Sequence, residues 1–200
     1  MAGWTTEDHQ YYEQGWWGNC VNTFSEETKQ ITYAWNMGLS NVPDSYTGRW
    51  PQYDLAGKSV LDIGGGPSSI LLKTVNGQGL VVADPCPYPA WVEARYAAMG
   101  ISQFREPGET FNAGRLFSEV WIYNVLQHVE DPQKIIANAH RHAPILRMFE
   151  WVNCEPTLGH PWKLTKEDLD DWIGNGADGT VAFVNENTAV GEAYFGVFPL

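Results

Sequence analysis

The sequence has little positive charge, little cysteine and no long apolar run. Its 12 lysine and arginine residues stand against 24 aspartate and glutamate residues, which gives the 200 residues a net charge of −12. A surface of that sign repels phosphate backbones, so we do not expect nucleic acid as a partner. The three cysteines, Cys20, Cys86 and Cys154, are too few and too widely spaced to predict a disulfide framework or a zinc site.

The chain also lacks the signals that direct a protein to a membrane or to secretion. The first residues hold no basic stretch followed by an apolar one, and no apolar run approaches the roughly 20 residues of a membrane helix. We therefore expect a cytoplasmic protein, monomeric or homodimeric, with no membrane partner. The five histidines are scattered, and His140 and His142 would face different sides of a helix, so no metal is expected.

What the sequence does hold is an alternation of apolar runs and helical patterns. Strands are predicted at 59–63, 79–83, 101–105, 118–123 and 145–152, helices at 67–75, 90–99, 132–142 and 165–173, and two last strands at 179–185 and 192–198. Strands that alternate with helices imply a parallel sheet. The predicted fold class is α/β, a Rossmann-like three-layer sandwich. Its mostly parallel seven-stranded sheet would end in an antiparallel C-terminal hairpin strand.

Residues 1–57 precede this alternation. We expect them to form an aromatic-rich helical lid or extension on a core of residues 58–200, the whole being one compact domain. Ser25 and the acidic residues after it predict a helix N-terminus, with Glu27 and Lys29 on its solvated face. The stretch 40–57 is predicted to be a loop.

A glycine-rich turn follows the first predicted strand of the core. Gly64, Gly65 and Gly66 would let the backbone approach a ligand closely, and Asp84, 20 residues beyond Gly64, would accept hydrogen bonds from ribose hydroxyls. Asp62 distinguishes a cationic adenosyl ligand from a dinucleotide, because a carboxylate there attracts a cation and repels a pyrophosphate. The alternative is that Asp62 only caps the turn. Together these residues favour a cationic adenosyl ligand.

With these residues, the sequence resembles the class I S-adenosylmethionine-dependent methyltransferases over residues 58–200. The resemblance is carried by VLDIGGG, VVADP and SEVWIYNVLQHVEDP, which are similar to the family's first, second and fourth-strand motifs. It implies an enzyme that uses S-adenosylmethionine and releases S-adenosylhomocysteine. It also implies which residues hold this cofactor: Asp62, Gly64, Gly65 and Gly66 at the methionine part, Asp84 with Pro85 at the ribose, and Glu109 at the adenine. Asn124 would lie beside the cofactor at the end of the fourth strand.

The features in which the sequence differs from parts of that family exclude some classes of methyl acceptor. NVLQHV lacks the Asn-Pro-Pro-aromatic or Asp-Pro-Pro-Tyr run of enzymes that methylate amino groups of bases or glutamine, and no Pro-Cys pair ends the fourth strand. We therefore expect methylation of an oxygen or nitrogen of a small molecule. His128 would take a proton from that acceptor, or would only pack or cap a helix there. A base is not strictly required, because the sulfonium is already a good leaving group.

Aromatic residues outside the motifs are candidates for the surroundings of the acceptor. The candidates are Tyr11, Tyr12, Trp16 and Trp17 in the N-terminal extension and Trp162 in the loop after the fifth strand. They would exclude water and face the sulfonium. Equally, they would anchor the extension to the sheet or belong to the core.

Three other functions share part of this pattern. A NAD(P)-dependent oxidoreductase has the same glycine turn and acidic residue, but it explains Asp62 poorly. A methyltransferase acting on protein or nucleic acid would need clustered basic residues, and those of this chain are scattered. A non-catalytic protein that binds an adenosyl ligand remains the third alternative.

Overall fold

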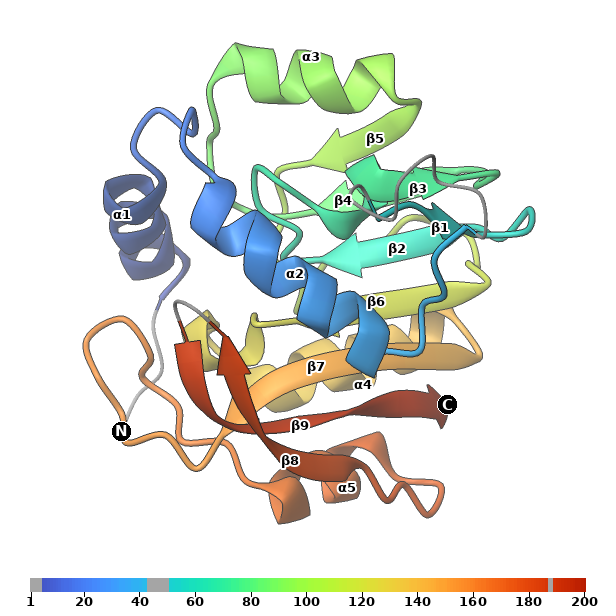
Figure 1. The fold of residues 1–200 in the computed structure, drawn as a ribbon. Coiled ribbons are helices and arrows are strands. Elements are labelled where there is room, and N and C mark those ends of the chain that lie inside the picture. The colour runs from blue at the N-terminus through green and yellow to red at the C-terminus, as the bar shows by residue number, and fades with distance from the viewer. Residues whose placement is uncertain (1–4, 43–50, 187–188) are drawn as a thin grey trace.

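The computed structural model describes residues 5–42, 51–186 and 189–200. Its centre is a seven-stranded sheet with the order β5-β4-β2-β6-β7-β9-β8 (Figure 1). Five strands are parallel: β5 (Ile101–Phe104), β4 (Leu80–Ala83), β2 (Val60–Ile63), β6 (Glu119–Tyr123) and β7 (Ile145–Val152). Antiparallel to β7 runs β9 (Ala189–Pro199), which pairs with β8 (Thr180–Glu186). The predicted α/β fold class and its antiparallel C-terminal hairpin are confirmed.

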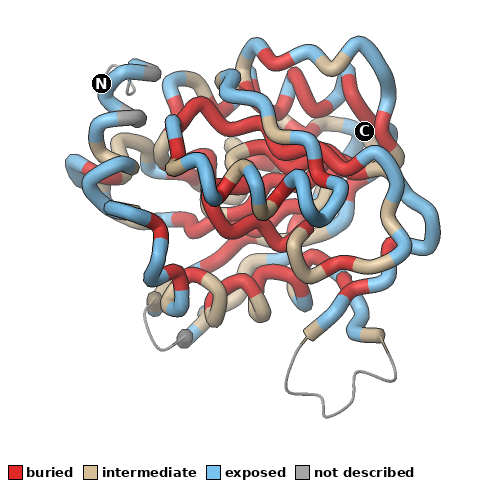
Figure 2. Tube along the Cα trace, turned by 90° about the horizontal axis from the view of Figure 1, so that it is seen from above, coloured by how far each residue is buried: buried red, intermediate tan, exposed pale blue. Residues whose placement is uncertain are grey.

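Helices cover both faces of this sheet. On one face lie α4 (Pro132–His142) and α5 (Lys166–Ile173), and on the other lie α2 (Phe24–Asn36) and α3 (Ala90–Ala98). Successive strand residues point to opposite faces. Leu61 and Ile63 accordingly pack with α4 and α5, whereas Val60 packs with α2 and α3. Figure 2 shows the buried residues concentrated in the strands, with exposed residues on the outer turns.

The segment after the glycine turn is not the helix predicted at 67–75. Ser69 caps only a single 3-10 turn, η1 (Ile70–Lys73), where its hydroxyl accepts a hydrogen bond from the N–H of Leu71 at 2.9 Å. The β-branched residues that follow extend into β3 (Thr74–Val75), which pairs with β1 (Tyr53–Asp54). β1 lies in the stretch expected to be a loop. Pairing between two segments far apart in sequence therefore overrides the local helical spacing.

The N-cap of α2 is Thr23 and not Ser25. The Thr23 hydroxyl donates to the Glu27 carboxylate at 2.6 Å, and the Thr23 carbonyl accepts from the N–H of Glu27 at 2.9 Å. The helix therefore starts at Phe24, and Ser25 lies inside its first turn.

A further helix, α1 (Thr6–Trp17), begins at a capping box formed by Thr5 and Asp8. In Figure 1 it lies on the side to which the arrowhead of β2 points. α1 is therefore placed over the carboxyl ends of the parallel strands. None of the helices in the described ranges has the length and hydrophobicity to cross a membrane.

Candidate active site

A cavity of about 380 Å³ opens at the carboxyl ends of the parallel strands. Gly64 follows β2, Asp84 follows β4 and Asn124 follows β6, and all three line it. The strand order reverses between β2 and β6, and open α/β sheets bind ligands at such a switch point. The volume falls within the ordinary range for small-molecule sites. This is the candidate active site.

The glycine turn allows no side chain at two of its positions. A Cβ added to Gly64 would lie 2.5 Å from Cγ2 of Val125, and one added to Gly65 would lie 2.6 Å from Oδ2 of Asp62. Gly64 and Gly66 also have φ values of 75° and 63°, which glycine adopts without strain. Residues 64–66 line the cavity, and their predicted contact with a ligand stays a prediction.

Asp62 lies behind this turn and does not line the cavity. It is fully buried, and its Oδ2 accepts hydrogen bonds from the hydroxyls of Ser69 and Tyr123 at 2.5 Å each. Its Oδ1 has no hydrogen-bond partner within the described ranges. Burial raises the pKa of Asp62 to about 7, against the two hydroxyl contacts. In this structure Asp62 shapes the turn, and its predicted contact with the ligand stays a prediction.

Asp84 is buried at the floor of the cavity. Oδ2 accepts from the N–H of Gly66 at 3.0 Å, and Oδ1 accepts from the N–H of Cys86 at 2.9 Å and from the Tyr88 hydroxyl at 3.1 Å. The carboxylate thus joins the glycine turn to the segment after β4. Its place in the lining fits the predicted contact with a ribose.

Pro85 and Glu109 line a separate, smaller cavity of about 20 Å³ beside Gly64 and Val125. The Glu109 carboxylate accepts hydrogen bonds from the N–H groups of Glu130 and Asp131, both at 3.2 Å. Burial raises the pKa of Glu109. The two residues therefore adjoin the main cavity without lining it, and an adenine ring would have to widen this space to reach them.

Only some of the aromatic residues predicted to cover the ligand line the cavity. Tyr12, Trp16 and Trp17 of α1 line the cavity, whereas Tyr11 is 83% exposed and points away from it. Trp162 packs against the core, and its indole N–H donates to the carbonyl of Val129 at 2.7 Å. Trp162 is therefore a structural residue here.

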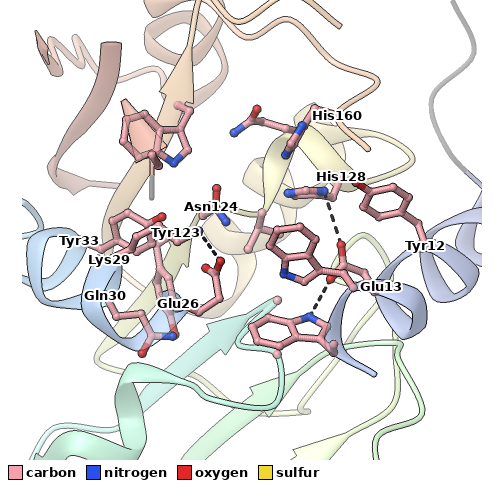
Figure 3. Close-up of a pocket in the computed structure, with 18 of the residues that line it drawn as sticks. Tyr12, Glu13, Glu26, Lys29, Gln30, Tyr33, Tyr123, Asn124, His128 and His160 are labelled. Carbon is pink, nitrogen blue, oxygen red and sulfur yellow. Dashed lines mark hydrogen bonds and ion pairs between the residues drawn. The ribbon is translucent and has the colours of Figure 1, made fainter. Parts of the chain in front are cut away.

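His128 lines the cavity as predicted, with two neighbours that the sequence did not indicate. It ends η2 (Leu126–His128), and its Nδ1 is 3.6 Å from Oε1 of Glu13 on α1. His160, from the loop after β7, lies with its ring centroid 4.5 Å from that of His128. Figure 3 shows Glu13 and His160 pointing toward His128 from different elements.

One face of α2 supplies a polar wall that the sequence interpretation missed. Glu26, Lys29, Gln30 and Tyr33 are buried and line the cavity (Figure 3). Glu26 and Lys29 form an ion pair with side chains only 10% and 11% exposed. The prediction that Lys29 lies on a solvated face is therefore wrong. The spacing i, i+3, i+4 and i+7 places these residues on one face of a helix, and that spacing was the available signal.

The segment between β6 and His128 is fixed from below by Glu150 of β7. Its Oε1 accepts hydrogen bonds from the N–H groups of Val125 at 2.9 Å and Leu126 at 3.1 Å. Burial raises the pKa of Glu150 to about 8, against these two contacts. Asn124 precedes the segment with a φ of 55°, which asparagine tolerates better than most residues.

The sequence matches no protein-family model and no curated protein. Solved structures, however, share its fold. The 1,6-didemethyltoxoflavin-N1-methyltransferase of Burkholderia thailandensis, solved with 1,6-didemethyltoxoflavin and S-adenosylhomocysteine, superposes over 96% of this chain and 86% of its own, with a TM-score of 0.63 and 12% identity.

Two further methyltransferases are also similar. The N-methyltransferase NodS of Bradyrhizobium japonicum WM9, in complex with S-adenosylhomocysteine, covers 72% of this chain and 78% of its own, with a TM-score of 0.56 and 18% identity. Magnesium protoporphyrin IX methyltransferase (ChlM) of Synechocystis PCC 6803, with bound S-adenosylmethionine, covers 84% and 77%, with a TM-score of 0.55 and 14% identity. The chain therefore has the Rossmann-like fold that these methyltransferases share.

Proposed function

We propose that this protein is an S-adenosylmethionine-dependent methyltransferase that acts on an oxygen or nitrogen of a small molecule. One observation carries the proposal: the Gly64–Gly66 turn and Asp84 meet at one cavity, at the switch point of a sheet with this fold. The open backbone suits close approach of a ligand, and Asp84 suits ribose hydroxyls. S-adenosylmethionine, when bound, supplies a methyl group on a sulfonium, so that a neutral thioether leaves.

The donor set of the cavity fits the charges of this cofactor. The amino-acid end of S-adenosylmethionine carries an ammonium and a carboxylate. In the buried pair, Glu26 offers a negative charge to the ammonium and Lys29 offers a positive charge to the carboxylate. Asp62 would act through the turn that it holds, and Asn124 would lie at the end of β6. Pro85 and Glu109 would lie on the adenine side, next to the smaller cavity.

The same site disfavours a dinucleotide. In dinucleotide-binding folds the pyrophosphate lies at the N-terminus of the helix that follows the glycine turn. Here only the four-residue 3-10 turn η1 follows, and Glu26 and Asp84 bring negative charge to the cavity. A pyrophosphate would therefore meet repulsion without a helix dipole to offset it.

A small acceptor fits the remaining space. α1 covers the cavity with Tyr12, Trp16 and Trp17, and Lys29 is the one lysine or arginine among the described residues of its lining. With a single basic residue, the described lining offers no cluster of positive charge that would bind a phosphate backbone. The three free cysteines are consistent with the cytoplasmic location that the sequence predicts.

Calorimetry with S-adenosylhomocysteine and with NAD tests the cofactor. We expect binding of the first alone, weakened by about 10- to 100-fold in Asp84→Asn because a charged hydrogen-bond acceptor is lost. Asp171→Asn, on the exposed side of α5, is the matched control and should bind like the wild type. Binding of NAD, or unchanged affinity in Asp84→Asn, contradicts the proposal. A screen with labelled donor then separates an enzyme from a non-catalytic adenosyl-binding protein.

A further inference from the structure

Glu13 and His128 come from distant parts of the chain and meet over the cavity. Glu13 lies on α1 and His128 follows β6, yet their side chains approach to 3.6 Å and are only 12% and 13% exposed (Figure 3). The Glu13 carboxylate is held by Trp17, whose indole N–H donates to Oε2 at 2.8 Å. This pair can form only while α1 lies over the cavity.

Other titratable groups surround both members of the pair. Asp84, from the segment after β4, and Glu26, from α2, face Glu13, as do Cys86 and Tyr88. Burial, and then the negative charge of Asp84, raises the pKa of Glu13 to about 8. His160 lies against His128, and burial together with Lys29 lowers the pKa of His160. His160 is thus a neutral neighbour near pH 7. Glu13 keeps its proton there in the ligand-free protein, and it becomes the anionic partner of His128 once a cation bound in the cavity lowers its pKa.

We propose that Glu13 and His128 form one proton-accepting pair, assembled by closure of α1, and that the methyl acceptor is a planar molecule whose reacting hydroxyl or ring N–H must lose its proton. The inference rests on the methyl transfer proposed above. Nε2 of His128 takes the proton with its lone pair, and the former O–H or N–H electron pair stays on the acceptor atom. Glu13 is a positioning residue, because its carboxylate orients the ring and stabilises the imidazolium.

The chemistry of the pair selects the class of acceptor. A tertiary amine has a lone pair and no proton to lose, so a base beside it has no role. A hydroxyl or ring N–H that is protonated at neutral pH gains about 10²- to 10⁴-fold from a positioned base. The aromatic walls Tyr12, Trp16 and Trp17 favour a planar ring by stacking. A phenol combines both properties.

An NMR titration of the histidine rings in the ligand-free protein tests the pairing. The His128 signal is assigned with His128→Gln, and Glu13→Gln is compared with Glu7→Gln, which removes an exposed carboxylate from the same helix. We expect the His128 ring signal to show a step near pH 8, where Glu13 ionises beside it. This step should disappear in Glu13→Gln and stay in Glu7→Gln. An identical His128 titration in Glu13→Gln overturns the pairing. No donor is needed, so this failure is distinct from a failure of the proposed methyl transfer.

A series of phenols of graded acidity, with a tertiary amine for comparison, tests the acceptor class. With labelled donor, Glu13→Gln and His128→Gln should slow transfer to weakly acidic phenols by about 100-fold. The loss should shrink for phenols already ionised at the assay pH, and Glu7→Gln should match the wild type. Donor binding with transfer to the amine alone, or transfer to phenols that neither substitution slows, overturns the inference and leaves the methyltransferase proposal standing.

Discussion

The buried carboxyl group of Glu150 accepts a hydrogen bond from the backbone N–H of Val125 at 2.9 Å. The same oxygen accepts from the N–H of Leu126 at 3.1 Å. The N–H of His128 in turn donates to the carbonyl of Val125 at 2.9 Å. One strand residue thus sets the position of the segment that carries His128.

Replacement of Glu150 should therefore depend on what the new side chain can accept. In Glu150→Leu two buried N–H groups lose their partner, and each such loss costs about 1–3 kcal/mol. Glu150→Gln keeps a carbonyl oxygen for both and should stay within about 1 kcal/mol of the wild type. Urea unfolding measures the difference. Equal stability of the two variants would show that water replaces the carboxylate.

Stability should fall as the pH rises from about 5 to about 8. Burial raises the pKa of Glu13 and of Glu150 to about 8, and that of Asp62 to about 7. A carboxyl group with a raised folded-state pKa stabilises the fold fully below its unfolded-state pKa, and this contribution is lost as the pH rises through the folded-state value. Chemical unfolding across this range measures the slope. Glu150→Gln should flatten it, and the exposed Glu106→Gln should not.

Two glycine substitutions should have opposite effects. A Cβ at Gly65 would lie 2.6 Å from Oδ2 of Asp62, so Gly65→Ala must displace the turn and should weaken binding of S-adenosylhomocysteine at least about tenfold. Gly15 lies within α1 and has nothing within 4 Å of an added Cβ. Gly15→Ala should stabilise the protein by about 0.5–1 kcal/mol. Calorimetry measures the affinity of Gly65→Ala, and thermal melts measure the stability of Gly15→Ala. Normal binding by Gly65→Ala would refute the proposal that the turn of residues 64–66 holds the ligand.

Binding of S-adenosylmethionine at pH 7 should release a proton. The pKa of Glu13 is about 8, chiefly through burial and then through the charge of Asp84. A cation bound beside Asp84 offsets that charge and lowers the pKa of Glu13, so the carboxyl group ionises. Calorimetry in buffers of different ionisation enthalpy counts the protons. Glu13→Gln should release none, and equal release by that variant would assign the proton to another group.

The sequence predicted β2, β4, β6 and β7 well because each is a largely apolar run followed by glycine, aspartate or asparagine. β6 and β7 are buried along most of their length, so their composition reflects their position in the sheet. The helix at 67–75 failed because β3 exists only through its pairing with β1, which a local pattern does not contain. Gly64, Asp84 and Asn124 were predicted as site residues because they directly follow strands, and all three line the cavity. Their contact with a cofactor stays a prediction.

The site residues that the sequence did not predict depend on contacts between distant parts of the chain or on burial by tertiary packing. Glu13 became a candidate only when α1 was placed beside His128, more than 100 residues away in the chain. Lys29 was predicted to lie on a solvated face because it is charged, whereas α2 buries it in an ion pair with Glu26. For Trp162 the sequence left a place beside the acceptor and a place in the core as alternatives, and its indole N–H bonds to the backbone of Val129 while its ring packs against the core.

The single turn η1 where a helix was expected leaves part of one sheet face without its usual cover. Tyr33 and Ala34 of α2 and Met37, which follows it, fill that face, in one apolar cluster with Trp121 and Phe149. An N-terminal segment that looks like an addition to the core is, in packing terms, one of its layers. Removal of residues 1–57 would therefore take away part of the apolar core along with the cover of the site, and the remaining chain would expose apolar surface and aggregate.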